Sequence, residues 1–406
     1  MMKATRREGG IPPKGHPRDA SSDRIAAARV YDSQVSTRWF MQHVRELVGS
    51  ADLRGPRDGH AAYELPSDPR ALDQLAVRGP GLRATSLRNV LHATDTDGCL
   101  VLRGGTVVYE KYFNGLRADA PHLWHSVSKS LVSCVAGNLV GAGRLDTSRP
   151  VAQYVAELSG SAYGDARVQH LLDMQVGIDY SEDYADVDSD VNELDRIYGL
   201  RPPRGPNHPG STYAYATTKP KKGAHGREFD YVSLNTNVLA WVIERATGEW
   251  LPDLIRSEVW GKIGGEHDAY VALDVAGGVQ AESGMCSSLR DLARLGLALL
   301  HGGRLADRQV VPAAWVDEIV RGGDPEAFAR HDHDSVLPEG SYKNNFWVAR
   351  SGADAAFMGL GIYGQMVYVN PAADLVVAKF SSQAVADSAE CFRREFLMCE
   401  CLAEQL

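Results

Sequence analysis

The chain has 406 residues, with 44% hydrophobic and 23% charged residues, which is typical of a globular protein and excludes fibrous and disordered classes. Its 43 basic and 52 acidic residues give a formal net charge of −9, which argues against nucleic acid or an anionic membrane as partner and favours a small molecule. The six cysteines form no CxxC pair, and no apolar run approaches the ~18 residues of a membrane span, so we expect a cytoplasmic protein without a disulfide framework.

Residues 1–60 are predicted to form an N-terminal arm and a docking helix, followed by one large domain that spans 61–406. Residues 1 to about 25 are rich in Gly, Pro and Arg without hydrophobic periodicity, which indicates a mobile arm. Apolar residues recur at helical spacing from Trp39 to Val48 and predict a helix that docks on the main body. Residues 50–80 are polar and punctuated by Pro and Gly, which is typical of a wrapping segment.

Two β-hairpins are predicted near the ends of the large domain. The first joins Cys99–Arg103 to Thr106–Phe113 through Gly104-Gly105, a pair favoured in tight turns. The second joins strands at about 363–369 and 375–381 through a turn that opens at Asn370-Pro371. Adjacent hairpins of this kind predict an antiparallel sheet.

The segment between the hairpins reads as mainly helical. Helical periodicity ending at glycines predicts helices over Ser126–Val140, Asn235–Thr247 and Leu289–Leu300, and a last helix over about 388–404. Residues 180–230 show few apolar runs and are expected to be loops over the body. The sequence therefore predicts an α+β fold, with an antiparallel sheet from about 85–120 and 305–406 and a mainly helical insertion over about 121–304.

A serine and a lysine one turn apart are the first candidates for chemistry. Ser126 stands at a predicted helix start and Lys129 follows three residues later, so both side chains share a helix face. A desolvated lysine with a lowered pKa can take the proton of a serine hydroxyl, and a helix N-terminus favours an oxyanion. The spacing alone is weak, because S-x-x-K arises by chance roughly 0.7 times in this composition, and an N-cap Ser before a solvated Lys would look the same.

Two downstream motifs accompany this pair. Tyr231 and Ser233 precede a predicted helix, where the phenol could shuttle a proton or simply pack at the helix entry. The glycines of Gly359–Gly364 fit G-x-G-x-x-G, but a strand follows them, so a dinucleotide loop is rejected. Glycines before a strand instead suit a close approach of the backbone to a ligand.

Taken together, five ordered blocks resemble the serine β-lactamase/penicillin-recognising superfamily. They are HSVSKS (125–130), LLDMQVGIDYSEDY (171–184), FDYVSLNTNVLAWVIERATG (229–248), SSLRDLARLG (287–296) and GIYGQMVYVNP (361–371). The resemblance is closest to the class C-like branch that contains 6-aminohexanoate-dimer hydrolases and related esterases. It implies a β-lactamase/transpeptidase-like fold from about residue 85 to the C-terminus.

The resemblance implies a role for each matching residue. Ser126 would be the acyl-accepting nucleophile, Lys129 its general base and Tyr231 the acid that serves the leaving group. The N–H groups of Ser126 and Ile362 would form the oxyanion hole. Substrate binding would involve Tyr180, which would hold the scissile amide nitrogen, together with Ser233, Gly361 and Tyr363.

One departure from the family pattern concerns its third motif. The family has a cation and a hydroxyl before a glycine, whereas this chain has Gly359-Leu360-Gly361. Placing Tyr363-Gly364 there instead restores no cation. The groups that grip a β-lactam carboxylate are therefore missing, which disfavours β-lactamase or transpeptidase activity.

An acidic run follows Tyr180 and bears on the charge of the substrate. Residues 180–195 contain seven acidic residues and no basic residue. One interpretation is a solvated loop. The other is that Asp186, Asp188 or Asp190 contacts an ammonium group of the substrate.

The sequence thus predicts a serine hydrolase of small linear amides or esters that needs neither metal nor cofactor. An amide-forming transacylase, an esterase of the same branch and a non-catalytic binding protein on this scaffold stay open as alternatives. The expected partner is a small amide or ester, with or without a free amine. A homodimer is compatible with the sequence, which does not specify the oligomeric state.

Overall fold

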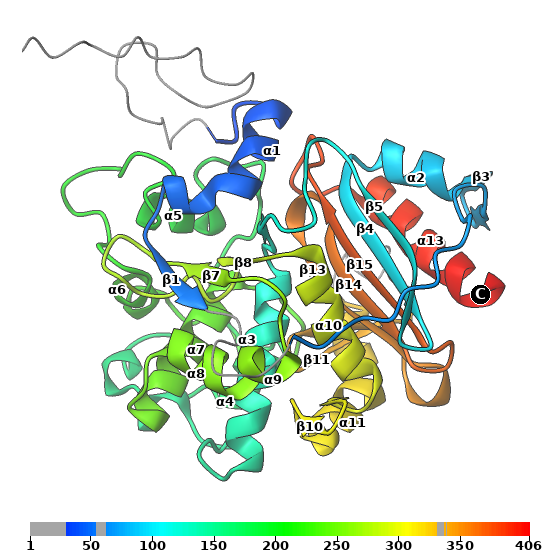
Figure 1. The fold of residues 1–406 in the computed structure, drawn as a ribbon. Helices are drawn as coiled ribbons and strands as arrows, with labels where there is room; N and C mark the ends of the chain where they lie inside the picture. Colours follow the sequence, from blue (N-terminus) through cyan, green and yellow to red (C-terminus); the bar gives the residue numbers. More distant parts are fainter. Residues whose placement is uncertain (1–29, 54–61, 331–336, 338) are drawn as a thin grey trace, which may run out of the picture.

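The computed structural model describes residues 30–53, 62–330, 337 and 339–406 (Figure 1). The arm predicted at residues 1 to about 25 lies outside these ranges. The predicted docking helix is observed as α1 (Gln34–His43), followed by a 3₁₀ turn, Val44–Glu46. It begins five residues earlier than predicted because Ser33 and Ser36 form a reciprocal capping box.

An antiparallel seven-stranded sheet forms one half of the molecule and confirms the predicted α+β class. The strand order is β11-β12-β13-β14-β15-β4-β5. The predicted hairpin β4-β5 therefore forms one edge of the sheet, and the predicted hairpin β14-β15 pairs with it through β15 and β4. The strands are β4 (Thr96–Arg103), β5 (Thr106–Tyr112), β11 (Ser341–Lys343), β12 (Phe346–Arg350), β13 (Ala356–Gly361), β14 (Gln365–Asn370) and β15 (Leu375–Ser381).

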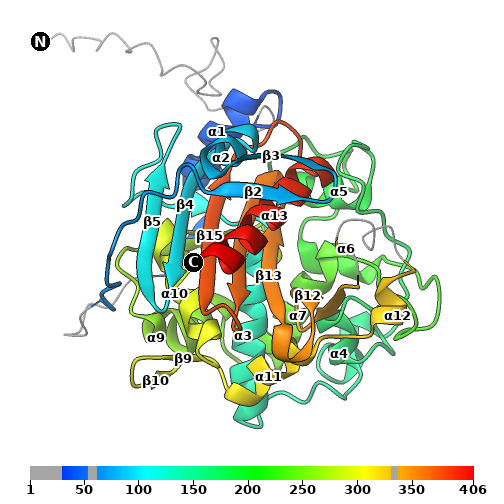
Figure 2. The same ribbon diagram turned by 90° about the vertical axis from the view of Figure 1, so that its right-hand side faces the viewer.

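Each face of this sheet packs on helices, because neighbouring residues of a strand point to opposite sides. On β4, Leu100 and Leu102 join the core beneath α3 (Val127–Gly141) and α10 (Leu289–Leu300). Cys99 and Val101 join a second core beneath α13 (Ala389–Gln405) and α2 (Leu87–Ala93). Figure 2 shows α13 crossing the outer face, with α3 on the other side.

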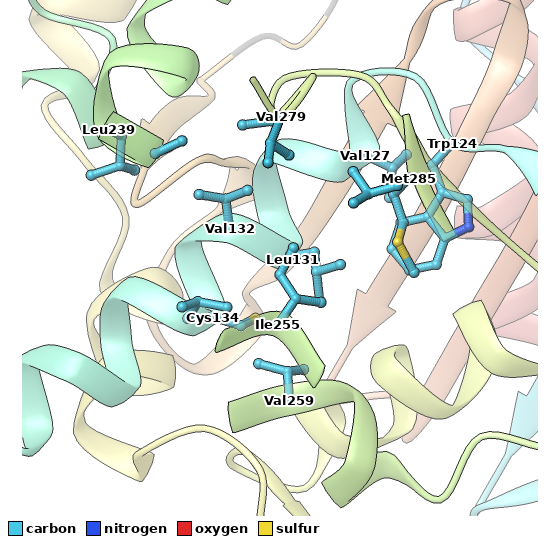
Figure 3. Packing of buried hydrophobic residues seen from close by; sticks show 14 of the residues in the cluster. Trp124, Val127, Leu131, Val132, Cys134, Leu239, Ile255, Val259, Val279 and Met285 are labelled. Atoms are coloured by element: carbon cyan, nitrogen blue, oxygen red, sulfur yellow. The ribbon is translucent and has the colours of Figure 1, made fainter. Parts of the chain in front are cut away.

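Helix α3 is the centre of the helical half. Val127, Leu131 and Val132 pack against residues of the segments around it, including Ile255 and Met285 (Figure 3). The other helices are α4 (Val168–Leu172), α5 (Asp190–Ile197), α6 (Thr212–Thr217), α7 (Ser233–Thr247), α8 (Leu251–Leu254), α9 (Gly261–Ile263), α11 (Ala313–Arg321) and α12 (Pro325–Phe328), with a π-helical turn, Ile255–Trp260. None of the helices in the described ranges is long and apolar enough to cross a membrane.

The prediction that residues 180–230 are only loops is wrong, because α5 and α6 lie there. Both are short helices that begin at serine caps: Ser189 accepts from the N–H of Asn192, and Ser211 accepts from the N–H of Ala214. Two turns of helix are too short to give a clear periodic signal.

A second sheet, which the sequence did not predict, ties the N-terminal segment to the helical half. Its order is β1-β7-β8-β6, made of β1 (Ser50–Leu53), β6 (His122–Leu123), β7 (Ala269–Ala272) and β8 (Met285–Ser287). A separate hairpin, β2 (Ala76–Gly79) and β3 (Leu82–Ser86), packs near α13. Because β6 ends at Leu123, this small sheet positions the chain just before Ser126.

Candidate active site

Ser126 stands immediately before α3, in a segment held from several sides. Trp124 donates its backbone N–H to Met285 O at 2.8 Å and its indole N–H to Ser287 Oγ at 3.0 Å. His125 adopts a left-handed conformation with φ +46°, which non-glycine residues rarely take. The Ser126 hydroxyl makes no capping bond to the helix and instead contacts Lys129 and Tyr231. The alternative of an ordinary N-cap serine is therefore wrong.

Lys129 points from α3 to Ser126 and is almost fully buried. Its Nζ donates to Ser126 Oγ at 2.8 Å, to Ser233 Oγ at 3.1 Å and to the backbone oxygen of Glu282 at 3.1 Å. Only 1% of the residue is exposed, which excludes the alternative of a solvated surface lysine. Burial lowers the pKa of Lys129 to about 8, although the nearby carboxylates of Glu182 and Glu282 raise it in part. Roughly one tenth of this amine is therefore neutral at pH 7 and about half at pH 8.

Tyr231 approaches the same hydroxyl from the segment before α7. A side-chain hydrogen bond joins it to Ser126, and its ring lies 5.1 Å from Lys129 Nζ. The ring stacks on Trp347 of β12 with centroids 5.3 Å apart. Burial, with a smaller contribution from Glu182, raises the pKa of Tyr231 well above its usual value. The resting phenol is therefore neutral and carries a proton that it can donate to a leaving group.

Ser126 and Ile362, the residues whose backbone N–H groups are predicted to form the oxyanion hole, both line the two cavities described below. No described group accepts a hydrogen bond from either of them. The glycine beside Ile362 permits this approach, since a Cβ at Gly361 would lie 2.5 Å from Trp124 O. The close approach predicted for these glycines is thus made to the chain around the nucleophile.

Two cavities meet at Ser126. The smaller, of about 80 Å³, is bordered by α1, α5 and the loop before β8 and contains Asp195, Arg201 and Glu282 in its wall. The larger, of about 620 Å³, contains Tyr231, Trp347 and Phe392. Ser126, Ile362 and Tyr184 border both, so a substrate with its carbonyl at Ser126 can extend into either side.

The structure keeps the three predicted acidic residues away from both cavities. Asp190 is bound by Lys219, Tyr215 and the N–H of Ser181. Asp188 pairs with Arg204 at 2.7 Å, and Asp186 is exposed and accepts from the N–H of Asp188. The acids that do line the cavities are Glu182, Asp183, Asp195, Asp230, Glu282, Asp387 and Glu395.

Tyr180 also lies outside the described walls of both cavities. Its ring packs near Lys219, with Nζ 5.9 Å from the centroid, and its hydroxyl is buried. Tyr184, four residues later, lines both cavities. Tyr363 lines the smaller cavity and stacks on Tyr31 at 5.9 Å.

Glu182 is the main site residue that the sequence analysis missed. It accepts from the N–H of Ser233 at 2.9 Å, from its hydroxyl at 2.5 Å and from the hydroxyl of Tyr184 at 2.6 Å. In the sequence it was one of seven acids in an acidic run. Only its two-residue spacing from Tyr184 distinguished it, and that signal is weak. In the part of the chain described, no cluster of three or more His, Cys, Asp or Glu is arranged for a metal ion.

Comparisons with known proteins show the family to which the chain belongs. The sequence matches the Beta-lactamase family over residues 92–399. It is 39% identical over 348 residues, 85% of each chain, to the 6-aminohexanoate-dimer hydrolase of Paenarthrobacter ureafaciens. A solved structure from Bacillus anthracis, provisionally assigned as a 6-aminohexanoate-dimer hydrolase, superposes with a TM-score of 0.81, 29% identity and coverage of 91% of this chain and 94% of the other.

More distant structures share the fold alone. A family VIII carboxylesterase superposes with a TM-score of 0.59 at 17% identity, covering 79% of this chain and 96% of that one. The matched family spans most of the chain, and the Paenarthrobacter relative covers it at well over 30% identity. The protein therefore belongs to the Beta-lactamase family, as the five sequence blocks predicted.

Proposed function

We propose that the protein is a serine acyl-enzyme hydrolase of small linear amides or esters, with Ser126, Lys129 and Tyr231 as its catalytic set. The observation that carries the proposal is the buried Lys129 amine, 2.8 Å from Ser126 Oγ. A neutral amine at this distance can accept the hydroxyl proton as Oγ attacks a carbonyl. The activity named for the Paenarthrobacter relative, hydrolysis of 6-aminohexanoate dimer, supports a linear amide as substrate.

In the proposed acylation step, Ser126 Oγ bonds to the carbonyl carbon while its proton moves to Lys129 Nζ. The N–H groups of Ser126 and Ile362 stabilise the oxyanion, a contribution worth about 10²–10³ in rate per donor. The bond to the leaving nitrogen or oxygen then breaks, and Tyr231 supplies the proton that the leaving group takes up. Water attacks the resulting ester and releases the acid.

The larger cavity suits the leaving group, because Tyr231 lies in its wall and does not border the smaller one. The acyl group then extends into the smaller cavity beside Asp195 and Arg201. The acidic residues around both cavities support an amine-bearing substrate. The cytoplasmic location and a homodimer stay predictions.

The test is acylation by p-nitrophenyl acetate or butyrate. We expect a burst of nitrophenol equal to the enzyme concentration, an acyl adduct on the peptide that contains Ser126, and loss of both in Ser126→Ala. Turnover that persists in Ser126→Ala would overturn the nucleophile assignment. Mass analysis of products from a linear amide with an added amine separates hydrolysis from amide formation.

A further inference from the structure

A chain of hydrogen bonds leads from the catalytic amine to a carboxylate that the reaction scheme has not used. Lys129 Nζ donates to Ser233 Oγ at 3.1 Å, and the Ser233 hydroxyl donates to Glu182 Oε1 at 2.5 Å. The backbone N–H of Ser233 donates to Glu182 Oε2 at 2.9 Å, and Tyr184 donates to Oε1 at 2.6 Å. Both carboxylate oxygens are therefore fixed, and one lies a single hydroxyl away from the general base.

The charges around this series of hydrogen bonds favour transfer of a proton from Lys129 to Glu182. No described Lys, Arg or His forms an ion pair with Glu182, and hydrogen bonds through Ser233 connect its carboxylate to the Lys129 amine. Burial raises the pKa of Glu182 and lowers the pKa of Lys129, which brings their proton affinities closer together. The titratable groups around Lys129 are Glu182, Glu282, Tyr231 and His125; those around Glu182 are Lys129, Tyr184, Tyr231, Tyr163, Tyr180 and Tyr342.

We propose that Glu182 is a positioning residue that takes up, through Ser233, the proton that Lys129 removes from Ser126. The inference rests on the proposed function and adds a residue that never touches the substrate carbonyl. As Lys129 passes a proton to Ser233 Oγ, the hydroxyl proton of Ser233 moves to Glu182 Oε1. Lys129 and Ser233 are then neutral, and Glu182 holds the proton while the acyl-enzyme exists.

The proton count closes over one turnover. Tyr231 has given its proton to the leaving group and becomes a phenolate, which takes a proton from the water that attacks the ester. When Ser126 Oγ departs, it regains a proton from Lys129, and the proton held by Glu182 returns through Ser233. The net reaction is addition of water across the amide or ester bond, and every side chain ends in its starting form.

The experiment compares Glu182→Gln with Glu182→Asp. Glu182→Gln removes a negative charge that raises the pKa of Lys129. The acidic limb of the kcat/KM profile should therefore move to lower pH by about 1 unit or more, since an opposite charge within about 4–6 Å shifts a pKa by about 1–3 units. Glu182→Asp keeps the charge, so its midpoint should stay near that of the wild type even where its rate falls. Glu157→Gln, an exposed glutamate paired with Arg245 at the surface, is the matched control and should leave the profile unchanged.

A second measurement reports the relay itself. In mixtures of H₂O and D₂O, the wild-type steady-state rate should depend non-linearly on the deuterium fraction, because several protons move together. Ser233→Ala removes the connecting hydroxyl and Glu182→Gln removes the acceptor, so both should give a linear dependence. Both variants should still form an acyl adduct on Ser126 with p-nitrophenyl acetate, at a lower rate than the wild type. Loss of the adduct only in Ser126→Ala therefore tests the nucleophile assignment separately from the relay.

Three results would overturn the inference. A pH profile of Glu182→Gln that superimposes on that of the wild type would exclude the electrostatic coupling. An equal downward shift in Glu182→Asp would assign the effect to packing alone. A curved proton inventory in Ser233→Ala would exclude the route through Ser233, and this arm stands even where Glu182→Gln fails to fold.

Discussion

Substitution of Gly361 by alanine tests whether the backbone next to Ile362 must lie against the nucleophile segment. The φ of Gly361 is −135°, which alanine adopts without strain, so only space opposes the change. The added Cβ would lie 2.5 Å from Trp124 O, 3.0 Å from Gln365 Cβ and 3.1 Å from His125 Cβ. Because a Cβ contact below about 3.0 Å is not tolerated, the strand end and the nucleophile segment must separate by at least about 0.5 Å.

The expected cost has two parts. Loss of one oxyanion donor costs about 10²–10³ in rate, and a displacement near 1 Å costs about 10². A shift of roughly half that size should lower kcat/KM by about 10- to 100-fold. Overpacking in a rigid interior costs about 1–3 kcal/mol of unfolding free energy.

The assay is steady-state hydrolysis of p-nitrophenyl butyrate together with thermal unfolding. Gly210→Ala is the matched control, because Gly210 is exposed and its Cβ would meet nothing within 4 Å. We expect Gly361→Ala to keep a measurable burst with a much slower rate, while Gly210→Ala behaves like the wild type. Wild-type kcat/KM and melting temperature in Gly361→Ala would show that the close approach is not needed for catalysis.

Three further predictions follow from burial and charge. The kcat/KM for an uncharged ester should rise with pH through a midpoint near 8, since Lys129 acts as a base only when neutral and its pKa is about 8; a flat pH-rate profile from 6 to 9 would exclude this role. Glu395→Ala should lower the free energy of unfolding in urea by about 3–5 kcal/mol, because the buried Lys379 amine, 2.5 Å from Glu395 in the wild type, loses its ion-pair partner. A loss below about 1 kcal/mol would contradict this pairing. Asp186→Asn should leave KM for an amine-bearing amide unchanged because Asp186 lines neither cavity, and a several-fold rise in KM would return this residue to the binding site.

Local features were predictable because their cause is local. The i, i+3 spacing of Ser126 and Lys129 places them on one helix face whatever surrounds the helix. The two hairpins were found from their turns and β-rich runs, and the helix Leu289–Leu300 was predicted with its observed bounds. The five ordered blocks were enough to predict the family that the comparisons show.

The chemistry of the site depends on contacts between distant segments, which a single sequence does not specify. The lowered pKa of Lys129 comes from burial under segments more than a hundred residues away, including Glu282. Glu182 reaches Ser233 across 51 residues. Asp190 binds Lys219 from 29 residues away and so does not line either cavity.

The sequence by itself therefore determined the fold class, the family and the three residues proposed for catalysis. Only the tertiary structure decided their pKa values and the residues of the cavity walls, where Tyr184 is present and Tyr180 is not. Side-chain spacing along a helix is fixed by backbone geometry, whereas burial and ion pairing arise from the packing of the whole chain.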